Sequence, residues 1–160
     1  MRVCFVCTGN ICRSPTAEAV FLWHAAEAGL AVEADSCGIS AEEFGNPPDR
    51  RAVAEARRRG IHLPDRRARQ VGAEDFAVPG LLVGMTGAHC RALDRLRPVA
   101  SPATVHLLLD FVPELRGQDV PDPWYGTGPR AFAEAYDLIE EGVRGMIAQL
   151  RVDGLLSRVG

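Results

Sequence analysis

Short apolar segments alternate along the chain with longer segments in which apolar residues recur every three or four positions. The short segments have the length and composition of buried strands and fall at residues 2–6, 31–36, 80–85 and 104–109. The helical pattern follows at residues 15–29, between Pro47 and Gly60, and at residues 88–96 and 129–150. Strands that alternate with helices predict a parallel sheet covered on both faces, with its functional site at the carboxyl ends of the strands.

The chain contains no internal repeat, low-complexity tract or linker. We therefore expect residues 1–160 to form a single α/β domain, because 160 residues of 47% hydrophobic composition suffice to bury one core. Residues 110–128 have no clear period and are rich in proline, and they separate the last predicted strand from the last helix. A loop of that length in a compact domain usually has a functional role.

Composition argues against several classes of function. Arginine and lysine number 18 against 21 acidic residues, and the net charge of -3 gives no basis for broad binding to nucleic acid or to anionic membranes. No apolar run approaches the roughly 18 residues of a membrane span, and the N-terminus enters the first strand without a hydrophobic leader, so we expect a cytoplasmic protein. The 5 cysteines, an odd number, favour thiol chemistry over a disulfide framework.

The strongest chemical signal lies between the first predicted strand and the first helix. Here Arg13 follows Cys7 closely, and Gly9 and Asn10 between them tolerate the positive φ of a tight turn. A loop that directs its N–H groups inward at a helix N-terminus binds tetrahedral anions, and an arginine side chain grips two of their oxygens. The same positive field stabilises a thiolate. We therefore predict that Cys7 attacks a phosphate held by this loop.

Ser14 has two possible roles in this segment. With Pro15 it is typical of a helix N-cap and first helical residue, and its hydroxyl also suits a hydrogen bond to the sulfur of Cys7. Asn10 suits a left-handed position that holds the loop. A buried, inert cysteine is the structural alternative for Cys7, but burial alone would not require the glycine–asparagine turn, the arginine and the serine–proline start together.

A phosphate ester attacked by sulfur needs an acid for its leaving oxygen, and the resulting phosphocysteine needs a base for water. The best candidate for both tasks is Asp122, in a segment stiffened by Pro121 and Pro123. The adjacent Trp124 and Tyr125 could form walls beside a ring-shaped substrate. A turn-initiating aspartate whose aromatic neighbours cap the core is the alternative, and the spacing shows no link to the cysteine loop.

A metal site receives little support from the sequence. Cys4 and Cys7 have the C-x2-C spacing of metal ligands, but Cys4 lies within the predicted strand and no second pair completes a ligand set. The histidines are scattered without ligand spacing, so we expect surface or capping positions for His24, His62, His89 and His106.

Residues 6–15 (VCTGNICRSP) and 122–126 (DPWYG), with residues 68–71 and 74–76 between them, resemble the low-molecular-weight protein tyrosine phosphatases. The resemblance covers nearly the whole chain and implies a flavodoxin-like three-layer sandwich with a four-stranded parallel sheet. It also implies a phosphotyrosyl protein substrate, a phosphocysteine intermediate and no metal or other cofactor. We expect no nucleic-acid or membrane partner, and a monomer or weak self-association.

By motif, the resemblance makes Cys7 the nucleophile, Arg13 the phosphate clamp and Asp122 the general acid and then base. The other expected site positions are the substrate- and phosphate-binding residues Thr8, Gly9, Asn10, Ile11, Cys12, Ser14, Trp124 and Tyr125, and the loop support Ser36. The family's reversible protective disulfide would join Cys7 to Cys12 and make the enzyme redox-regulated. A small apolar loop filler is the alternative for Cys12.

The chain departs from the family pattern at several positions that bear on substrate preference. Glu42 stands where an aromatic residue often lines the pocket, which leaves Phe44 as a possible substitute. Arg66 falls where many members have a histidine that braces the loop, and Thr86 replaces a common aspartate after Met85. Residues 36–40 (SCGIS) also differ from the usual serine–alanine–glycine–threonine.

Three other functions remain open. Bacterial protein-arginine phosphatases share the scaffold and a similar Met85-Thr86, but an apolar Ile11 and the Trp124-Tyr125 pair favour a phenyl ring over a guanidinium. Arsenate reductases on the same fold need a further cysteine pair, a pattern that Cys37 and Cys90 do not form. A phosphoprotein-binding module that does not turn its ligand over is the non-catalytic alternative.

Overall fold

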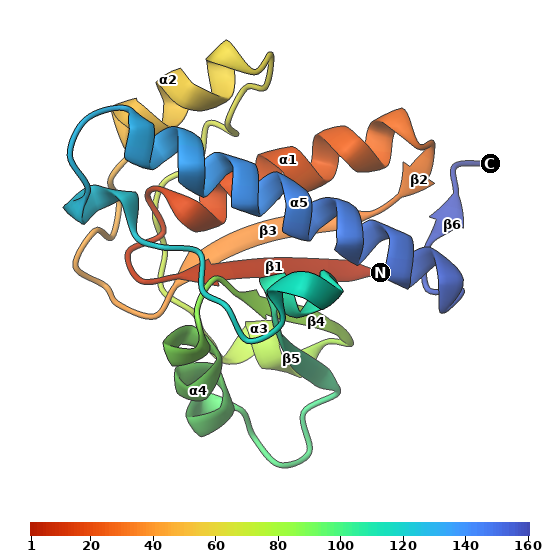
Figure 1. The fold of residues 1–160 in the computed structure, drawn as a ribbon. Coiled ribbons are helices and arrows are strands. Elements are labelled where there is room, and N and C mark those ends of the chain that lie inside the picture. Colours follow the sequence, from red (N-terminus) through yellow and green to blue (C-terminus); the bar gives the residue numbers. More distant parts are fainter.

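A four-stranded parallel sheet lies at the centre of the fold, in a computed structural model that describes residues 1–160. Its strands are β1 (Arg2–Cys7), β3 (Glu33–Gly38), β4 (Gly80–Gly84) and β5 (Ala103–Leu107), arranged in the order β3-β1-β4-β5 (Figure 1). The inner strand β1 is buried on both faces, which explains its unbroken apolar run.

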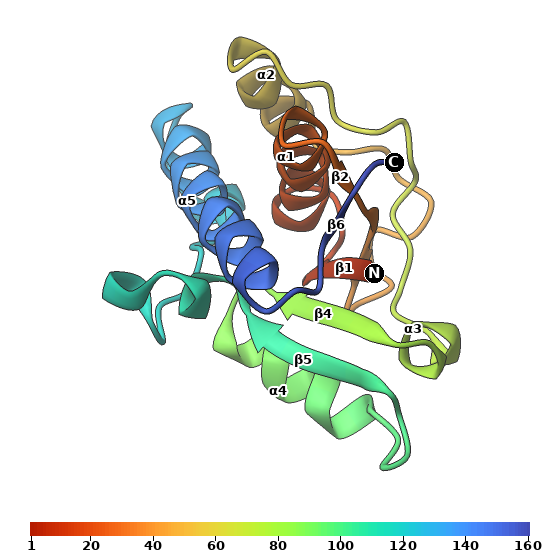
Figure 2. The same ribbon diagram turned by 90° about the vertical axis from the view of Figure 1, so that its right-hand side faces the viewer.

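Helices cover both faces of the sheet, so that the molecule has three layers (Figure 2). One face carries α1 (Arg13–Glu27), α2 (Arg50–Arg58) and α5 (Arg130–Val152), and the other carries α3 (Ala73–Ala77) and α4 (Gly87–Leu96). The larger hydrophobic core, of 24 residues, lies between the sheet, α1 and α5, and the core on the other face has 7 residues. The predicted flavodoxin-like α/β fold is confirmed.

Element boundaries differ from the sequence-based expectation in several places. The second strand lies at Glu33–Gly38 rather than residues 31–36, and β5 ends at Leu107 because the chain turns into a 3-10 helix at Leu108–Phe111. The loop predicted at residues 110–128 contains two further 3-10 helices, Pro113–Leu115 and Pro123–Tyr125. Helix α3 was not predicted, and neither was the small antiparallel pair of β2 (Leu30–Ala31) and β6 (Ser157–Arg158).

The start of α1 corrects one prediction that bears on the site. The helix begins at Arg13 with Cys12 at the N-cap position, and no side chain caps it. Ser14 is therefore not the N-cap, because its buried hydroxyl points to Cys7 instead. The N–H groups of the first turn remain without a side-chain acceptor at the end of the helix that faces the loop.

None of the helices combines the length and the apolar character that crossing a bilayer requires.

Candidate active site

The loop of residues 8–12 joins the carboxyl end of β1 to the start of α1, and it borders a cavity of about 160 Å³. Cys7, the last residue of β1, is 3% exposed and reaches this cavity. The cavity also contains Arg13 and Asp122 from distant parts of the chain. Its full lining is Cys7, Thr8, Gly9, Ile11, Cys12, Arg13, Glu42, Glu43, Asp122, Trp124 and Tyr125.

Asn10 determines the shape of the loop. Its φ of 59° places it in the left-handed region, as the sequence predicted, and its side chain is buried. The side-chain Oδ1 accepts the N–H of Arg69 at 3.0 Å, which orients the amide. The Nδ2 group then donates to Ser14 Oγ at 2.8 Å and to Ser36 Oγ at 3.0 Å. One asparagine thus connects the loop, α1, β3 and the segment before α3.

Ser14 presents its hydroxyl to the sulfur of Cys7, with Oγ 3.0 Å from Sγ. Because Ser14 Oγ accepts from Asn10, its own hydrogen is free for Cys7 Sγ or for the Cys37 carbonyl, which lies 3.3 Å away. A thiolate has no hydrogen to donate, so the serine hydroxyl is the group that donates to it. The hydroxyl of Ser14 is therefore placed to donate to Sγ.

Ser36 continues the network toward a buried carboxylate that sequence analysis did not find. It donates from Oγ to Glu18 Oε2 at 3.0 Å, and Glu18 is 1% exposed. Arg66 Nη1 lies 2.8 Å from Glu18 Oε1, an ion pair without hydrogen-bond alignment. Burial raises the pKa of Glu18 to about 7 against the opposing influence of Arg66 and Ser36. Arg66 is therefore connected to the loop only indirectly, through Glu18, which binds Ser36, which in turn binds Asn10.

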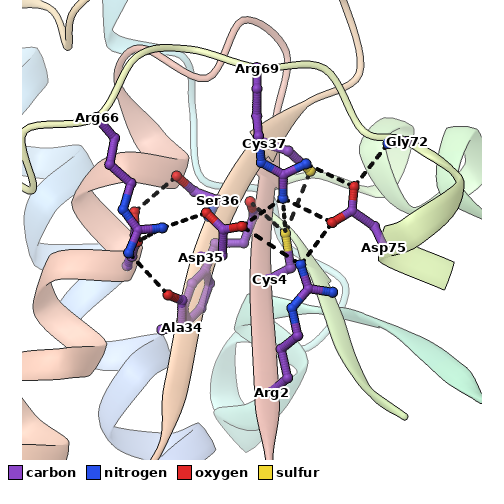
Figure 3. Close-up of polar contacts among 12 residues, drawn as sticks. Arg2, Cys4, Ala34, Asp35, Ser36, Cys37, Arg66, Arg69, Gly72 and Asp75 are labelled. Carbon is purple, nitrogen blue, oxygen red and sulfur yellow. Dashed lines mark hydrogen bonds and ion pairs between the residues drawn. The ribbon is translucent and has the colours of Figure 1, made fainter. Parts of the chain in front are cut away.

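Arg66 also pairs with Asp35, which belongs to an ionic cluster that anchors the segment that carries Arg69 (Figure 3). Arg69 donates to Asp75 at 2.8 and 2.9 Å and to Asp35 at 2.8 Å. The side chain of Asp75 is fully buried and also accepts from Arg2 and from the N–H of Gly72. Burial opposes its charge, but the hydrogen bond from Arg69 and the others lower its pKa overall. This cluster fixes the backbone N–H that orients Asn10.

The loop that carries Asp122 is held against the cysteine loop by backbone contacts. Val120 donates its N–H to the Met85 carbonyl at 2.9 Å, and its own carbonyl accepts from Arg13 Nη1 at 3.0 Å. Arg13 Nη2 lies 3.5 Å from Asp122 Oδ2. The other carboxylate oxygen accepts the N–H of Trp124 at 3.0 Å. Asp122 thus begins a turn and also lines the cavity, but its aromatic neighbours Trp124 and Tyr125 are exposed and do not cap the core.

The two aromatic residues after Asp122 form one wall of the cavity. Trp124 is half exposed, Tyr125 is 84% exposed, and the guanidinium of Arg51 lies 5.0 Å from the centre of the Trp124 ring. Glu42 and Glu43 border the cavity as well. Phe44 is 70% exposed and does not line it, so the structure gives no support to Phe44 as a substitute for the missing aromatic residue.

The other cysteines lie apart from this cavity. Cys4 Sγ is 3.5 Å from Cys37 Sγ on the neighbouring strand, both sulfurs being buried in the smaller core. Cys90 lies on α4 and approaches the His106 carbonyl. Only Cys7 and Cys12 border the cavity.

Comparison with known proteins identifies the family. The family model described as "Low molecular weight phosphotyrosine protein phosphatase" matches residues 2–155. The chain belongs to this family. Family members are cysteine-dependent protein phosphatases, and the position of Cys7 in the cavity agrees with that chemistry.

Two similar members of the phosphatase family are bacterial proteins. A low molecular weight protein-tyrosine-phosphatase of Streptomyces coelicolor is 44% identical over 155 residues, covering 94% of this chain and 93% of that protein. The YfkJ phosphatase of Bacillus subtilis is 38% identical over 153 residues, covering 94% of this chain and 96% of that protein. The YfkJ crystal structure superposes with a TM-score of 0.87 over 96% of each chain, at 35% identity.

An arginine phosphatase shares the same scaffold. A YwlE mutant with a phosphorylated active-site serine superposes with a TM-score of 0.84 at 29% identity, covering 96% of this chain and 97% of that one. The family fold therefore serves more than one kind of phosphorylated residue.

The raised pKa of Glu18 predicts a pH-dependent effect of Glu18→Gln on stability. Because the folded-state pKa of about 7 exceeds the ordinary glutamate value of 4.5, ionisation of Glu18 disfavours the folded state as pH rises through that interval. The glutamine variant avoids this loss. We expect its free energy of unfolding, relative to wild type, to increase by roughly 2 kcal/mol between pH 4.5 and pH 8.

Urea unfolding at a series of pH values measures this difference. Glu141→Gln, on the exposed side of α5, is the control for removal of one carboxylate and should show a much smaller change. A Glu18→Gln difference that is constant with pH, or that grows toward acid pH, would contradict the assignment.

Proposed function

We propose that the protein is a protein-tyrosine phosphatase that hydrolyses phosphotyrosine through a phosphocysteine intermediate on Cys7. The observation that carries the proposal is the convergence of Cys7, Arg13 and Asp122 on one cavity bordered by an anion-binding loop. The family membership and the names of its tyrosine-phosphatase relatives support the same substrate class.

Phosphate binding rests on backbone and side-chain donors. The loop of residues 8–12 lies at the N-terminus of α1, whose first-turn N–H groups have no side-chain cap, and a phosphate dianion satisfies such groups. Arg13 supplies a guanidinium that is 5% exposed, and its orientation is set by the Val120 carbonyl and Asp122. The attraction between this guanidinium and a phosphate is stronger in so sheltered a site than it would be at the surface.

In the first step the thiolate of Cys7 attacks phosphorus, and the bond from phosphorus to the phenolic oxygen breaks. Asp122, entering as the carboxylic acid, gives its proton to that oxygen. In the second step the Asp122 carboxylate removes a proton from water, the water oxygen bonds to phosphorus, and the sulfur leaves as a thiolate. Ser14 stabilises the thiolate before attack and after release, because its hydroxyl donates to Sγ.

Selection of a phenyl ring is assigned to the cavity wall. Trp124 and Tyr125 present aromatic surface beside the entrance, and Ile11 adds an apolar side chain from the loop. Together these residues suit a flat ring that carries its phosphate inward to Cys7.

Phosphoarginine is the second candidate substrate. Glu42 and Glu43 both border the cavity, and carboxylates are suitable partners for a guanidinium. The similarity of Met85-Thr86 to arginine phosphatases lies outside the cavity, where the Thr86 hydroxyl accepts the N–H of His89 and caps α4. Arsenate reduction has less support, since Cys37 is buried against Cys4 and neither Cys37 nor Cys90 borders the cavity.

Substitution of the two reacting residues tests the mechanism with an aryl phosphate substrate. We expect Cys7→Ser to abolish turnover while retaining phosphate binding, because a serine hydroxyl is a far weaker nucleophile than a thiolate. Asp122→Ala should lower kcat by about 10²-fold, because the leaving oxygen then departs without a proton. EDTA should leave the wild-type rate unchanged, since Arg13 and the loop amides neutralise the phosphate.

Matched controls are Cys90→Ser, a thiol outside the cavity, and Asp65→Ala, an exposed aspartate. Turnover by Cys7→Ser at the wild-type rate would reject the phosphocysteine route. Phosphate binding by wild type without any turnover would favour the binding-module alternative.

Parallel assays distinguish the two substrate classes. With peptides of one sequence that carry either phosphotyrosine or phosphoarginine, we expect kcat/KM to favour phosphotyrosine by at least about tenfold, because a ring gains aromatic contact area that a guanidinium does not. Trp124→Ala should reduce this preference. A preference for the phosphoarginyl peptide would assign the enzyme to the second class.

Reversible inactivation by peroxide is expected from the second cavity cysteine. Peroxide converts the Cys7 thiolate to a sulfenic acid, and the Cys12 thiol then displaces water to form a disulfide. Burial raises the pKa of Cys12, and the charge of Cys7 raises it further, so oxidation of Cys7 removes one obstacle to this attack.

Mass spectrometry should detect the Cys7–Cys12 crosslink, and dithiothreitol should restore activity. The Cys12→Ser variant should lose most of this recovery, whereas Cys90→Ser should recover like wild type. Irreversible loss in wild type at mild doses, without the crosslink, would contradict the prediction.

A further inference from the structure

His89 connects the N-terminus of α4 to the first residue of the phosphate-binding loop. The imidazole is buried, with 6% of the residue exposed. Its Nδ1 lies 3.1 Å from the backbone nitrogen of Thr86, and its Nε2 lies 2.9 Å from Thr8 Oγ1. Thr8 directly follows Cys7 and lines the cavity, so His89 stands directly behind the cavity wall.

The donor and acceptor roles in this contact follow from the backbone. An N–H group can only donate, so Nδ1 of His89 is the acceptor for Thr86 and carries no hydrogen. The neutral ring then has its hydrogen on Nε2 and donates to Thr8 Oγ1. Burial, together with the positive charge of Arg13, lowers the pKa of His89 to about 4, so the ring stays neutral at physiological pH.

Backbone contacts from the β3 side hold Thr8, the residue that His89 contacts from the α4 side. The Thr8 carbonyl accepts the N–H of Ser40 at 2.9 Å, and the Cys7 carbonyl accepts the N–H of Ile39 at 3.0 Å. A Cβ on Gly38 would lie 2.6 Å from the Thr8 carbonyl oxygen, which shows how closely β3 approaches. These contacts fix the backbone of Thr8 but leave its side chain free to rotate. The hydrogen bond with His89 is what orients that side chain.

We propose that His89 is a positioning residue of the active site, which holds Thr8 through its Nε2–H and keeps the first turn of the loop in its phosphate-binding shape. The inference rests on the proposed phosphatase function and extends it. Asn10 and Ser36 hold the later part of the loop from the α1 and β3 side, and His89 holds its beginning from α4. The hydroxyl hydrogen of Thr8 is left free to donate, because His89 occupies its oxygen as a donor.

Two substitutions separate the contact with Thr8 from the cap of α4. His89→Asn keeps a side-chain acceptor near Nδ1 and loses the donor to Thr8. His89→Gln reaches Thr8 with an amide N–H and loses the Nδ1 acceptor for the Thr86 N–H, which is the side-chain half of the cap. The cap of α4 also affects the loop that carries Asp122. Gly87, in the capped first turn, donates its N–H to Asp119 of that loop at 2.8 Å.

The experiment measures the dissociation constant of inorganic phosphate by calorimetry, the inhibition constant of phosphate against an aryl phosphate, and Tm for each variant. We expect His89→Asn to weaken phosphate binding about fivefold with little change in Tm. His89→Gln should weaken binding less than about twofold and lower Tm by more. His89→Asn should therefore have the weaker phosphate binding and His89→Gln the lower Tm. If His89 had a purely structural role, the variant with the lower Tm would also bind phosphate more weakly.

Thr8→Val removes the acceptor and should weaken phosphate binding about fivefold on its own. Adding His89→Asn to Thr8→Val should then cause no further loss. Phosphate affinity that follows Tm across the variants, or losses that multiply in the double variant, would overturn the proposal. Calorimetry does not need turnover, so failure to hydrolyse phosphotyrosine would reject the proposed function alone, and failure of wild type to bind phosphate would reject both.

Discussion

The short loop between β1 and α1 has to reverse the chain immediately after Cys7, and this constraint governs the structure around it. A loop of residues 8–12 between a strand and a helix can turn this sharply only with a left-handed residue, which is Asn10. The same side chain accepts a hydrogen bond from the Arg69 N–H and donates hydrogen bonds to Ser14 and Ser36. Loss of its amide would leave the N–H of Arg69 unpaired and would remove one hydrogen bond each from Ser14 and Ser36, which costs more than loss of one exposed contact.

The supporting network runs from neutral groups near the sulfur to ionic groups farther away. Ser14, Asn10 and Ser36 are uncharged, and beyond them lie the Glu18–Arg66 pair and the cluster of Arg69 with Asp75 and Asp35. A buried ionic group costs desolvation energy, so its value here lies in fixing the geometry of the backbone that meets Asn10.

The same loop is held from all three layers of the sandwich. Helix α1 and strand β3 position its later residues, whereas α4, on the opposite face of the sheet, meets Thr8 through His89. The loop of Asp122 is held at the same edge of the sheet. Val120 is hydrogen-bonded to Met85 and Arg13, and Asp119 is hydrogen-bonded to Gly87. The same elements therefore hold the loop after Cys7 and the loop of Asp122, and Arg13, which directly follows the first loop, contacts the second.

Much of this protein follows from local sequence. Apolar runs and helical periods predicted the parallel sheet and its main helices, because burial on both faces of a strand and on one face of a helix leaves a pattern in the chain. The loop motif from Cys7 to Ser14 predicted the left-handed Asn10 and the contact between Ser14 and the sulfur, since both depend on neighbouring residues. The prediction that Ser14 is the N-cap was wrong, because its hydroxyl lies against the sulfur of Cys7 and the helix begins one residue earlier, at Arg13.

Contacts between distant segments were decided only by the tertiary structure. The approach of Asp122 to Arg13, the burial of Glu18 beside Ser36 and the contact of His89 with Thr8 join residues with no common period or spacing. Their positions depend on how strand order, crossovers and helix packing bring separate loops to one edge of the sheet. Local propensity acts over a few residues, whereas these distances are set by the packing of the whole core.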